Sequence, residues 1–208
     1  MSQLIHRYTV QERVNHWMVA VSFILLALSG LALFLPQFFV LSYVLGGGTW
    51  ARILHPFIGV LLVLGFGRMA LRYWNDNKIT DADRQWMKRI GDVIRNRDQG
   101  LPEIGKYNPG QKYQFRTWVV SILLLFVSGV VMWQPYFTPY FTVGVVRVAV
   151  LVHAFSAFVA ILGLIAHVYA GVVWVRGSLR AMTQGTVTAS WAKEHHPAWY
   201  RSVSKGAK

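Results

Sequence analysis

The sequence contains no cysteine among its 208 residues. Disulfide bonds, iron–sulfur clusters bound by this chain and covalent c-type haem attachment all require cysteine, so the sequence excludes them. Any metal site must therefore use histidine, carboxylate or methionine ligands. Acidic residues are also scarce, since 8 Asp and Glu accompany 21 Lys and Arg and give a formal net charge of +13.

Charged residues of both signs make up only 14% of the chain, whereas a soluble domain carries about 25%. This shortfall, together with a hydrophobic content of 54%, indicates that lipid surrounds much of the chain. An excess of basic residues is often typical of nucleic-acid binding. Here these residues lie beside apolar runs, as orientation signals and lipid-headgroup contacts do, so we expect membrane lipids and no nucleic acid as partners.

A transmembrane helix needs about 20 apolar residues, and four segments of the chain meet that requirement. They cover about residues 14–35, 53–74, 115–133 and 145–175. Tryptophan and tyrosine side chains lie near the ends of these segments, where interfacial aromatic belts occur. The sequence therefore predicts an all-α membrane protein in which residues 1–208 form a single domain, a four-helix transmembrane bundle.

The basic residues are distributed unevenly between the two ends of the predicted bundle. Two lie in the N-terminal tail, ten between Arg72 and Arg116, and six in the C-terminal tail. The two connections on the other side carry one each, Arg52 and Arg147. Because cytoplasmic loops are enriched in Lys and Arg, both termini are predicted to lie in the cytoplasm.

The basic loop between the second and third spans has a helical pattern of its own. Its apolar residues recur at helical spacing with charged residues between them: Trp86, Met87, Ile90, Val93 and Ile94. This pattern predicts an amphipathic helix on the cytoplasmic surface of the membrane, ended by Gly100 and Pro102.

Four of the seven histidines fall within the predicted spans: His16, His55, His153 and His167. Ionisable residues inside a membrane are costly and are usually functional. His153 and His167 are 14 residues apart, which places them about 21 Å apart along one helix and about 40° short of four full turns. Both side chains are therefore predicted to point the same way, one near each membrane surface.

Helix direction sets the depth of each histidine. With cytoplasmic termini, His16 opens the first span on the cytoplasmic side and His55 opens the second on the periplasmic side. The fourth span runs inward, so depth pairs His153 with His55 and His167 with His16. Two histidines that face each other across a bundle can bind one haem iron from both sides. Structural hydrogen bonding or proton relay is the alternative, whereas the separation of His153 from His167 argues against a single zinc site.

Several longer motifs follow one another along almost the whole chain. They are RYTVQERVNHW, ARILHPFIGV, GKYNPGQK, SGVVMWQPYF, the H-x13-H pair of the fourth span, and WAKEHHPAWYR near the end. In this order and spacing the set resembles the cytochrome b (gamma) subunit of membrane-bound respiratory formate dehydrogenase. The resemblance implies two b-type haems, with His55 and His153 as ligands of the periplasmic haem and His16 and His167 as ligands of the cytoplasmic haem.

The resemblance also implies what the chain does. Electrons from formate pass from a molybdenum- or tungsten-containing catalytic (alpha) subunit through an iron–sulfur (beta) subunit and this chain to menaquinone or ubiquinone. Proton uptake from the cytoplasm then generates a proton motive force across the bacterial inner membrane. The chain has no site for formate oxidation of its own, so its catalytic part is quinone reduction, and a trimer of heterotrimers fits the family.

The loop KYN-x-GQK resembles the quinone site of that family, which maps onto Asn108, Gly110 and Gln111. Amide side chains can hydrogen-bond a quinone carbonyl, but Asn-Pro-Gly is also a good turn on its own. Pro109 departs from the family pattern and stiffens the loop. Two other functions stay open for the chain: a cytochrome b subunit of a hydrogenase or another quinone-linked oxidoreductase, and a haem-free membrane scaffold or transporter.

Overall fold

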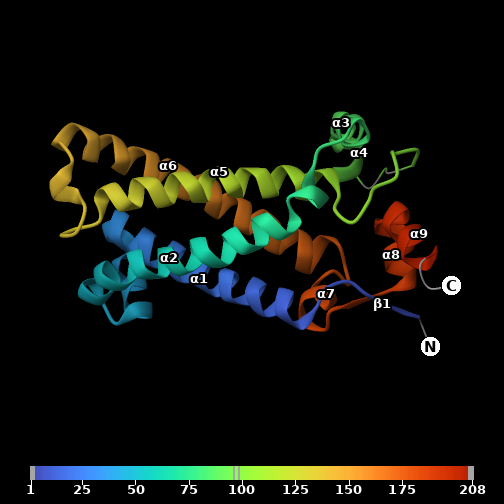
Figure 1. Cartoon of the computed structure of the whole chain (residues 1–208), viewed down its shortest axis with the longest axis horizontal. Coiled ribbons are helices and arrows are strands. Elements are labelled where there is room, and N and C mark those ends of the chain that lie inside the picture. The colour runs from blue at the N-terminus through green and yellow to red at the C-terminus, as the bar shows by residue number, and fades with distance from the viewer. Residues whose placement is uncertain (1–2, 96, 98, 206–208) are drawn as a thin grey trace. The chain divides into compact units, whose positions relative to one another are not determined.

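The computed structural model describes residues 3–95, 97 and 99–205, and four long helices dominate it (Figure 1). They are α1 (Val10–Phe34), α2 (Gly48–Tyr73), α5 (Pro109–Met132) and α6 (Val143–Tyr169), which continues in a π-helical turn, Ala170–Trp174. Two 3-10 helices lie in the connections: η1 (Pro36–Leu45) and η3 (Thr138–Tyr140). The four long helices are apolar enough to cross a membrane, so the predicted all-α fold with four transmembrane helices is confirmed.

Helix α1 begins at Val10, before the predicted span. Its first turn is polar, so a search for apolar residues does not include it. The backbone N–H of Thr9 donates to Glu12 Oε2 at 2.9 Å, and the backbone N–H of Glu12 donates to Thr9 Oγ1 at 3.3 Å. This reciprocal pair is a capping box, which satisfies backbone donors that a helix leaves without intrahelical partners. A search for apolar runs does not detect such a start, and the helix extends beyond the predicted span at this end.

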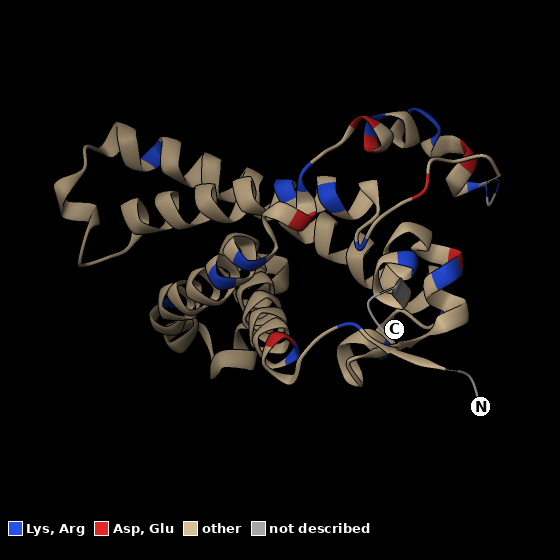
Figure 2. Ribbon diagram, turned by 45° about the vertical axis from the view of Figure 1, so that its right-hand side comes forward, with Lys and Arg blue, Asp and Glu red and all other residues tan. Residues whose placement is uncertain are grey.

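Backbone packing divides the chain into two compact units. The membrane unit contains residues 14–71 and 117–167, and the terminal unit contains residues 1–13, 72–116 and 168–208. The membrane unit carries only three charged side chains, all of them arginines: Arg52, Arg68 and Arg147. All other Lys, Arg, Asp and Glu residues belong to the terminal unit (Figure 2). A unit with so few charges and no carboxylate suits a lipid environment.

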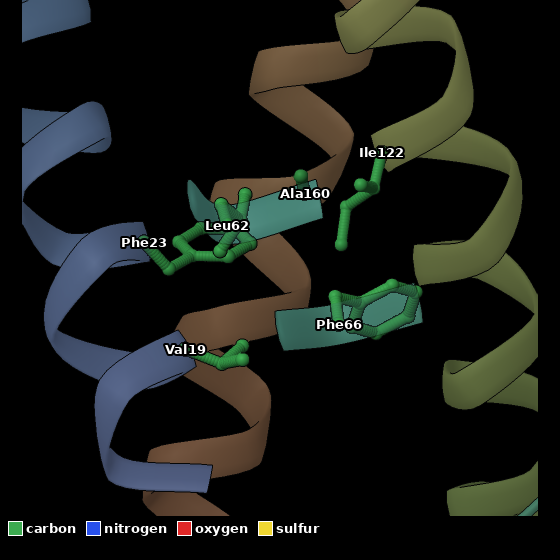
Figure 3. Close-up of a cluster of buried hydrophobic side chains, with 6 residues drawn as sticks. All are labelled: Val19, Phe23, Leu62, Phe66, Ile122 and Ala160. Atoms are coloured by element: carbon green, nitrogen blue, oxygen red, sulfur yellow. The ribbon is translucent and has the colours of Figure 1, made fainter. Parts of the chain in front are cut away.

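The core of the membrane unit is a small cluster to which all four long helices contribute (Figure 3). Its members are buried apolar side chains: Val19, Phe23, Leu62, Phe66, Ile122 and Ala160. Many larger apolar residues point outward instead, and on α6 the side chains of Leu151 and Phe155 are 71% and 70% exposed. Apolar residues on the outside of a helical bundle are what a lipid solvent favours.

The terminal unit contains a pair of strands that the pattern of apolar residues did not predict. Strand β1 (Leu4–His6) pairs antiparallel with β2 (Thr186–Thr188), and Ile5 lies opposite Val187 in the register. Three short helices accompany this ribbon in the C-terminal segment: α7 (Leu179–Thr183), α8 (Ala189–His195) and α9 (Pro197–Lys205). Two strands far apart in sequence thus bring the N-terminal tail to the C-terminal tail.

The segment predicted to form one amphipathic helix contains two shorter helices, α3 (Asp81–Lys88) and α4 (Ile90–Ile94), after a 3-10 turn at Asn75–Asn77, and an amphipathic surface helix stays a prediction. The chain departs from helical geometry at Arg89, with φ −106° and ψ 20°. The guanidinium of Arg89 donates to the Gly100 carbonyl at 3.1 Å, which ties the break to the following loop. The position of these helices on a membrane surface stays a prediction.

Arg7 holds three segments of the terminal unit together. Its guanidinium donates to the Lys106 carbonyl at 2.5 Å and to His196 Nε2 at 3.4 Å, and it lies over the Trp199 ring at 4.5 Å. Because a guanidinium only donates, Nε2 accepts and Nδ1–H of His196 donates to the Gly105 carbonyl at 2.8 Å. Burial, and then Arg7, lower the pKa of His196 to about 3. His196 is therefore neutral and structural.

Candidate functional site

The rings of His55 and His153 lie opposite each other in the membrane unit. His55 is in the first third of α2 and His153 is in the first half of α6. Their ring centres are 6.3 Å apart, and the ring planes are inclined by 55°. A metal–imidazole bond of about 2.0 Å, with each ring centre about 1.1 Å beyond its nitrogen, puts two opposed imidazoles about 6.2 Å apart. The observed spacing therefore fits one iron bound by both histidines.

Ser29 of α1 fixes which nitrogen of His55 is available to a metal. The Ser29 hydroxyl donates its single proton to the Leu25 carbonyl at 2.7 Å, and the same oxygen lies 2.8 Å from His55 Nδ1. The hydroxyl has no second proton, so Nδ1 must be the donor in the contact with His55. Nε2 is then unprotonated, which is the form of imidazole that ligates a metal.

Ser128 of α5 repeats this arrangement at the second histidine of the pair. Its hydroxyl donates to the Leu124 carbonyl at 2.6 Å and lies 3.0 Å from His153 Nδ1. Nε2 of His153 is therefore also unprotonated by the same proton count. Both histidines of the pair are thus in the tautomer that a haem iron requires.

A glycine follows each of these serines, and it lies against the ring of the same histidine. A Cβ atom on Gly30 would lie 3.4 Å from His55 Cε1, and a Cβ atom on Gly129 would lie 3.3 Å from His153 Cε1. A Cβ atom would therefore crowd the ring slightly at Gly129 and would be in ordinary contact with it at Gly30. The two glycines keep the edges of both rings clear, as binding of a flat macrocycle between helices requires.

The second pair consists of His16 in the first third of α1 and His167 near the end of α6. Their ring centres are also 6.3 Å apart, with the planes inclined by 44°. Trp118 packs edge-on against His167, with ring centres 5.2 Å apart. Asn15, beside His16, donates to the Gly65 carbonyl at 2.9 Å and so fixes this turn of α1 against α2. The spacing of this pair fits one bound iron as well as that of the first pair does.

The Nδ1 atom of His16 differs in its hydrogen bonding from the Nδ1 atoms of His55 and His153. In the described part of the chain, Nδ1 of His16 is buried and has no hydrogen-bond partner. Among the described residues there is also no group of three or more His, Asp or Glu side chains that would hold a metal ion directly. The histidines therefore occur as separate pairs, which suits two haem irons and does not suit zinc.

The residues of the predicted quinone loop come together at the start of α5. The Asn108 N–H donates to Gln111 Oε1 at 2.9 Å, and the Gln111 N–H donates to Asn108 Oδ1 at 2.8 Å. A Cβ atom on Gly110 would lie 3.3 Å from Asn108 Oδ1, so glycine leaves room for this contact. Pro109 occupies the first helical position, where its fixed φ is favourable. The loop is therefore a well-formed helix cap.

Ser29 and Ser128 were not among the predicted site residues. The sequence does carry a signal for them, because S-x6-S-G occurs twice, at residues 22–30 and 121–129. A histidine follows each serine of the SG pair, 26 residues later in one case and 25 in the other. A repeated pair of this kind, each copy followed by a membrane histidine, marks two helix hairpins with the same local design.

A four-helix membrane bundle with two facing histidine pairs places the protein in the class of membrane b-type cytochromes. Residues 7–185 match the family model described as prokaryotic cytochrome b561. This chain belongs to the prokaryotic cytochrome b561 family.

The chain is also similar to named subunits of formate dehydrogenases. It is 45% identical over 199 residues to the formate dehydrogenase cytochrome b556(fdo) subunit of Escherichia coli K12, covering 96% of this chain and 93% of the relative. It is 40% identical over 195 residues to the formate dehydrogenase cytochrome b556 subunit of Haemophilus influenzae, covering 94% and 82%. Identity to the nitrate-inducible cytochrome b556(Fdn) subunit of Escherichia coli K12 is 37% over 204 residues, covering 98% and 94%.

Proposed function

We propose that this chain is the di-haem cytochrome b subunit of a formate dehydrogenase and that it carries electrons across the membrane to a quinone. The observation that carries the proposal is the presence of two histidine pairs, each with ring centres 6.3 Å apart. His153 and His167 lie on one helix, about 21 Å apart along its axis, so the two pairs are at different depths. The formate dehydrogenase relatives, which match nearly the whole chain, support the choice of partner enzyme.

His55 and His153 would hold the haem on the periplasmic side, and His16 and His167 would hold the haem on the cytoplasmic side. When bound, such a haem supplies one-electron transfer, because two histidine ligands leave no iron position open to oxygen. The chain thereby receives electrons from the periplasmic iron–sulfur subunit, which is fed by the molybdenum or tungsten subunit. It delivers them to menaquinone or ubiquinone, with protons taken up from the cytoplasm.

The distribution of basic residues supports this orientation. The N-terminal ends of α2 and α6 carry one basic residue each, Arg52 and Arg147, whereas the tails and the loop between Arg72 and Arg116 carry the remainder apart from Arg68. The positive-inside rule therefore favours an orientation in the bacterial inner membrane with both termini on the cytoplasmic side. Assembly as a trimer of heterotrimers is part of the same proposal and rests on the family resemblance.

The test is made on the complex purified in detergent with its partner subunits. We expect the pyridine haemochrome assay to give two b haems per copy of this chain, and formate added without oxygen to reduce both. Hydrogen gas is the control donor and is expected to reduce neither. A folded chain without haem would contradict the proposal and leave the histidines as structural or proton-relay groups, and reduction by hydrogen alone would assign the chain to a hydrogenase.

We further propose that Asn108, Gly110 and Gln111 contact the quinone. The helix cap uses one carbonyl oxygen from each amide side chain. Each NH2 group still has donors for another acceptor, and a quinone carbonyl is such an acceptor. Gly110 leaves room for the Asn108 amide beside the backbone, so the capping residues and the quinone-binding residues can be the same.

Gln111→Glu separates the two roles of this side chain. Glutamate keeps the oxygen that caps the helix but has no NH2 donor, so the start of α5 stays intact. Loss of one hydrogen bond is expected to raise the KM for quinone about fivefold, from a contribution of about 1 kcal/mol. The measurement is formate-dependent quinone reduction, with haem reduction by formate and thermal stability as controls that stay unchanged. An unchanged KM would mean that Gln111 only caps the helix.

A further inference from the structure

The two histidine pairs differ in a feature that bears on electron transfer. His55 and His153 each donate Nδ1–H to a serine hydroxyl, at 2.8 and 3.0 Å. In contrast, His16 Nδ1 is buried and has no partner in the described part of the chain. A ligand that donates its outer N–H to an oxygen carries more electron density and binds the more oxidised metal more strongly. The two histidine pairs would therefore give a bound iron unequal surroundings.

The serine oxygens are good acceptors because their own protons are engaged. Each hydroxyl donates to the carbonyl four residues earlier, that of Leu25 or Leu124. A hydroxyl that donates becomes a stronger acceptor, since neighbouring hydrogen bonds polarise one another in a low-dielectric environment. The chain from histidine N–H through serine to backbone carbonyl thus directs electron density toward the ring and toward a metal bound at Nε2.

Helix packing alone does not account for these contacts. Buried serines in membrane helices often donate to the carbonyl of the preceding turn without a further role. Ser22 and Ser121 lie seven residues before Ser29 and Ser128 on the same helices and are equally buried. In the described part of the chain, neither of these earlier serines bonds to a histidine, so only the second serine of each repeat has the contact.

We propose that Ser29 and Ser128 are positioning residues that hold His55 and His153 in the Nδ1–H tautomer and lower the reduction potential of the haem these histidines bind. The inference rests on the proposed function, because it concerns a haem at this pair. It goes further by assigning a role to two residues that contact neither the iron nor the substrate. It predicts that the haem with the serine contacts gains electrons less readily than it would without them.

The test compares Ser29→Ala and Ser128→Ala with the matched controls Ser22→Ala and Ser121→Ala in the intact complex. The readout is the midpoint potential of each haem, from a redox titration followed by visible and EPR spectroscopy. A His16→Ala complex, which is expected to keep only the His55/His153 haem, supplies the reference spectrum for that haem.

Ser29→Ala is expected to raise the potential of this haem by an amount equal to about a threefold shift in its reduction equilibrium, the effect of losing part of one hydrogen bond. Ser128→Ala is expected to do the same, because it removes the matching contact with His153. The other haem and both controls are expected to keep their potentials. Unchanged potentials in both variants, or equal shifts in the controls, would overturn the inference.

If the Ser29→Ala complex loses this haem, the test uses Ser29→Thr instead, because threonine retains the hydroxyl. A haem at the original potential in Ser29→Thr supports the inference, and its absence there overturns it. Titration of the unaltered complex separates this result from the proposed function. Two haems in that complex with no response to the serine variants would remove the inference and leave the proposed function intact, whereas no haem at all would remove the proposed function.

Discussion

Replacement of His16 or His167 by alanine is expected to reduce the haem content of the complex from two haems per chain to one. Each histidine is one of two proposed ligands at its site, with ring centres 6.3 Å apart, and alanine cannot bind iron. The His55/His153 haem is expected to remain and to be reduced by formate. Quinone reduction is expected to fall to the background rate, because the proposed carrier on the cytoplasmic side is missing. Pyridine haemochrome analysis and a formate-to-quinone assay measure the two effects.

His6→Ala is the control for this experiment, since His6 lies in β1 and is exposed. It should leave the content at two haems. Retention of both haems in His16→Ala or His167→Ala would show that these residues are not a ligand pair. Loss of both haems in a folded protein would show that the two sites do not form independently.

The second large effect is expected from Asp83→Ala, which should destabilise the terminal unit by about 3 kcal/mol. Asp83 Oδ2 lies 2.8 Å from Lys112 Nζ, and the two side chains are only 5% and 10% exposed. Removal of the carboxylate leaves a buried ammonium without its counter-charge, which costs more than the pair itself contributes. The loss of stability is measured by thermal unfolding of the purified complex, with proteolysis of the 72–116 segment as the probe of unfolding.

Asp81 provides the matched control on the same helix. Its ion pair with Arg84 is 3.0 Å long but the side chains are 86% and 67% exposed, so Asp81→Ala should change stability by less than about 0.5 kcal/mol. Equal effects at the two positions would contradict the burial argument.

The Asp83 contribution should also depend on pH. Burial opposes ionisation of Asp83, but hydrogen bonds from Lys112 and Thr80 outweigh it and lower the pKa of the carboxyl below its usual value. The contribution is therefore complete above the unfolded pKa of about 4 and is lost as the pH falls through the lower folded value.

The sequence predicted the four long helices because uninterrupted apolar length is a direct requirement of a lipid solvent. It did not predict where α1 and α5 begin, because capping pairs such as Asn108 and Gln111 are polar and short. The ribbon of β1 and β2 was also missed, since three residues of each strand carry no periodic pattern. The break at Arg89 is accompanied by a contact with the carbonyl of Gly100 in the following loop, which the spacing of apolar residues does not report.

For the candidate site, helix direction and residue spacing were enough to match His55 with His153 and His16 with His167 in depth. Ring separation depends on how the helices pack, so the structure was needed to obtain it. The serines were overlooked because a serine in an apolar helix is ordinary, and only its register against a histidine on the next helix distinguishes Ser29 from Ser22. The role of the histidines as haem ligands stays a prediction until haem is measured.

Helix α6 carries one histidine of each pair, and this has a consequence for the rate of electron transfer. The separation of His153 from His167 is set by the rise of a continuous hydrogen-bonded helix and not by packing between helices. Tilting of the bundle in a thicker or thinner bilayer changes the angle of α6 to the membrane but leaves that separation constant. The interval between the two proposed haem sites is therefore set within one continuous helix, and variation in lipid thickness or neighbouring subunits leaves it unaltered.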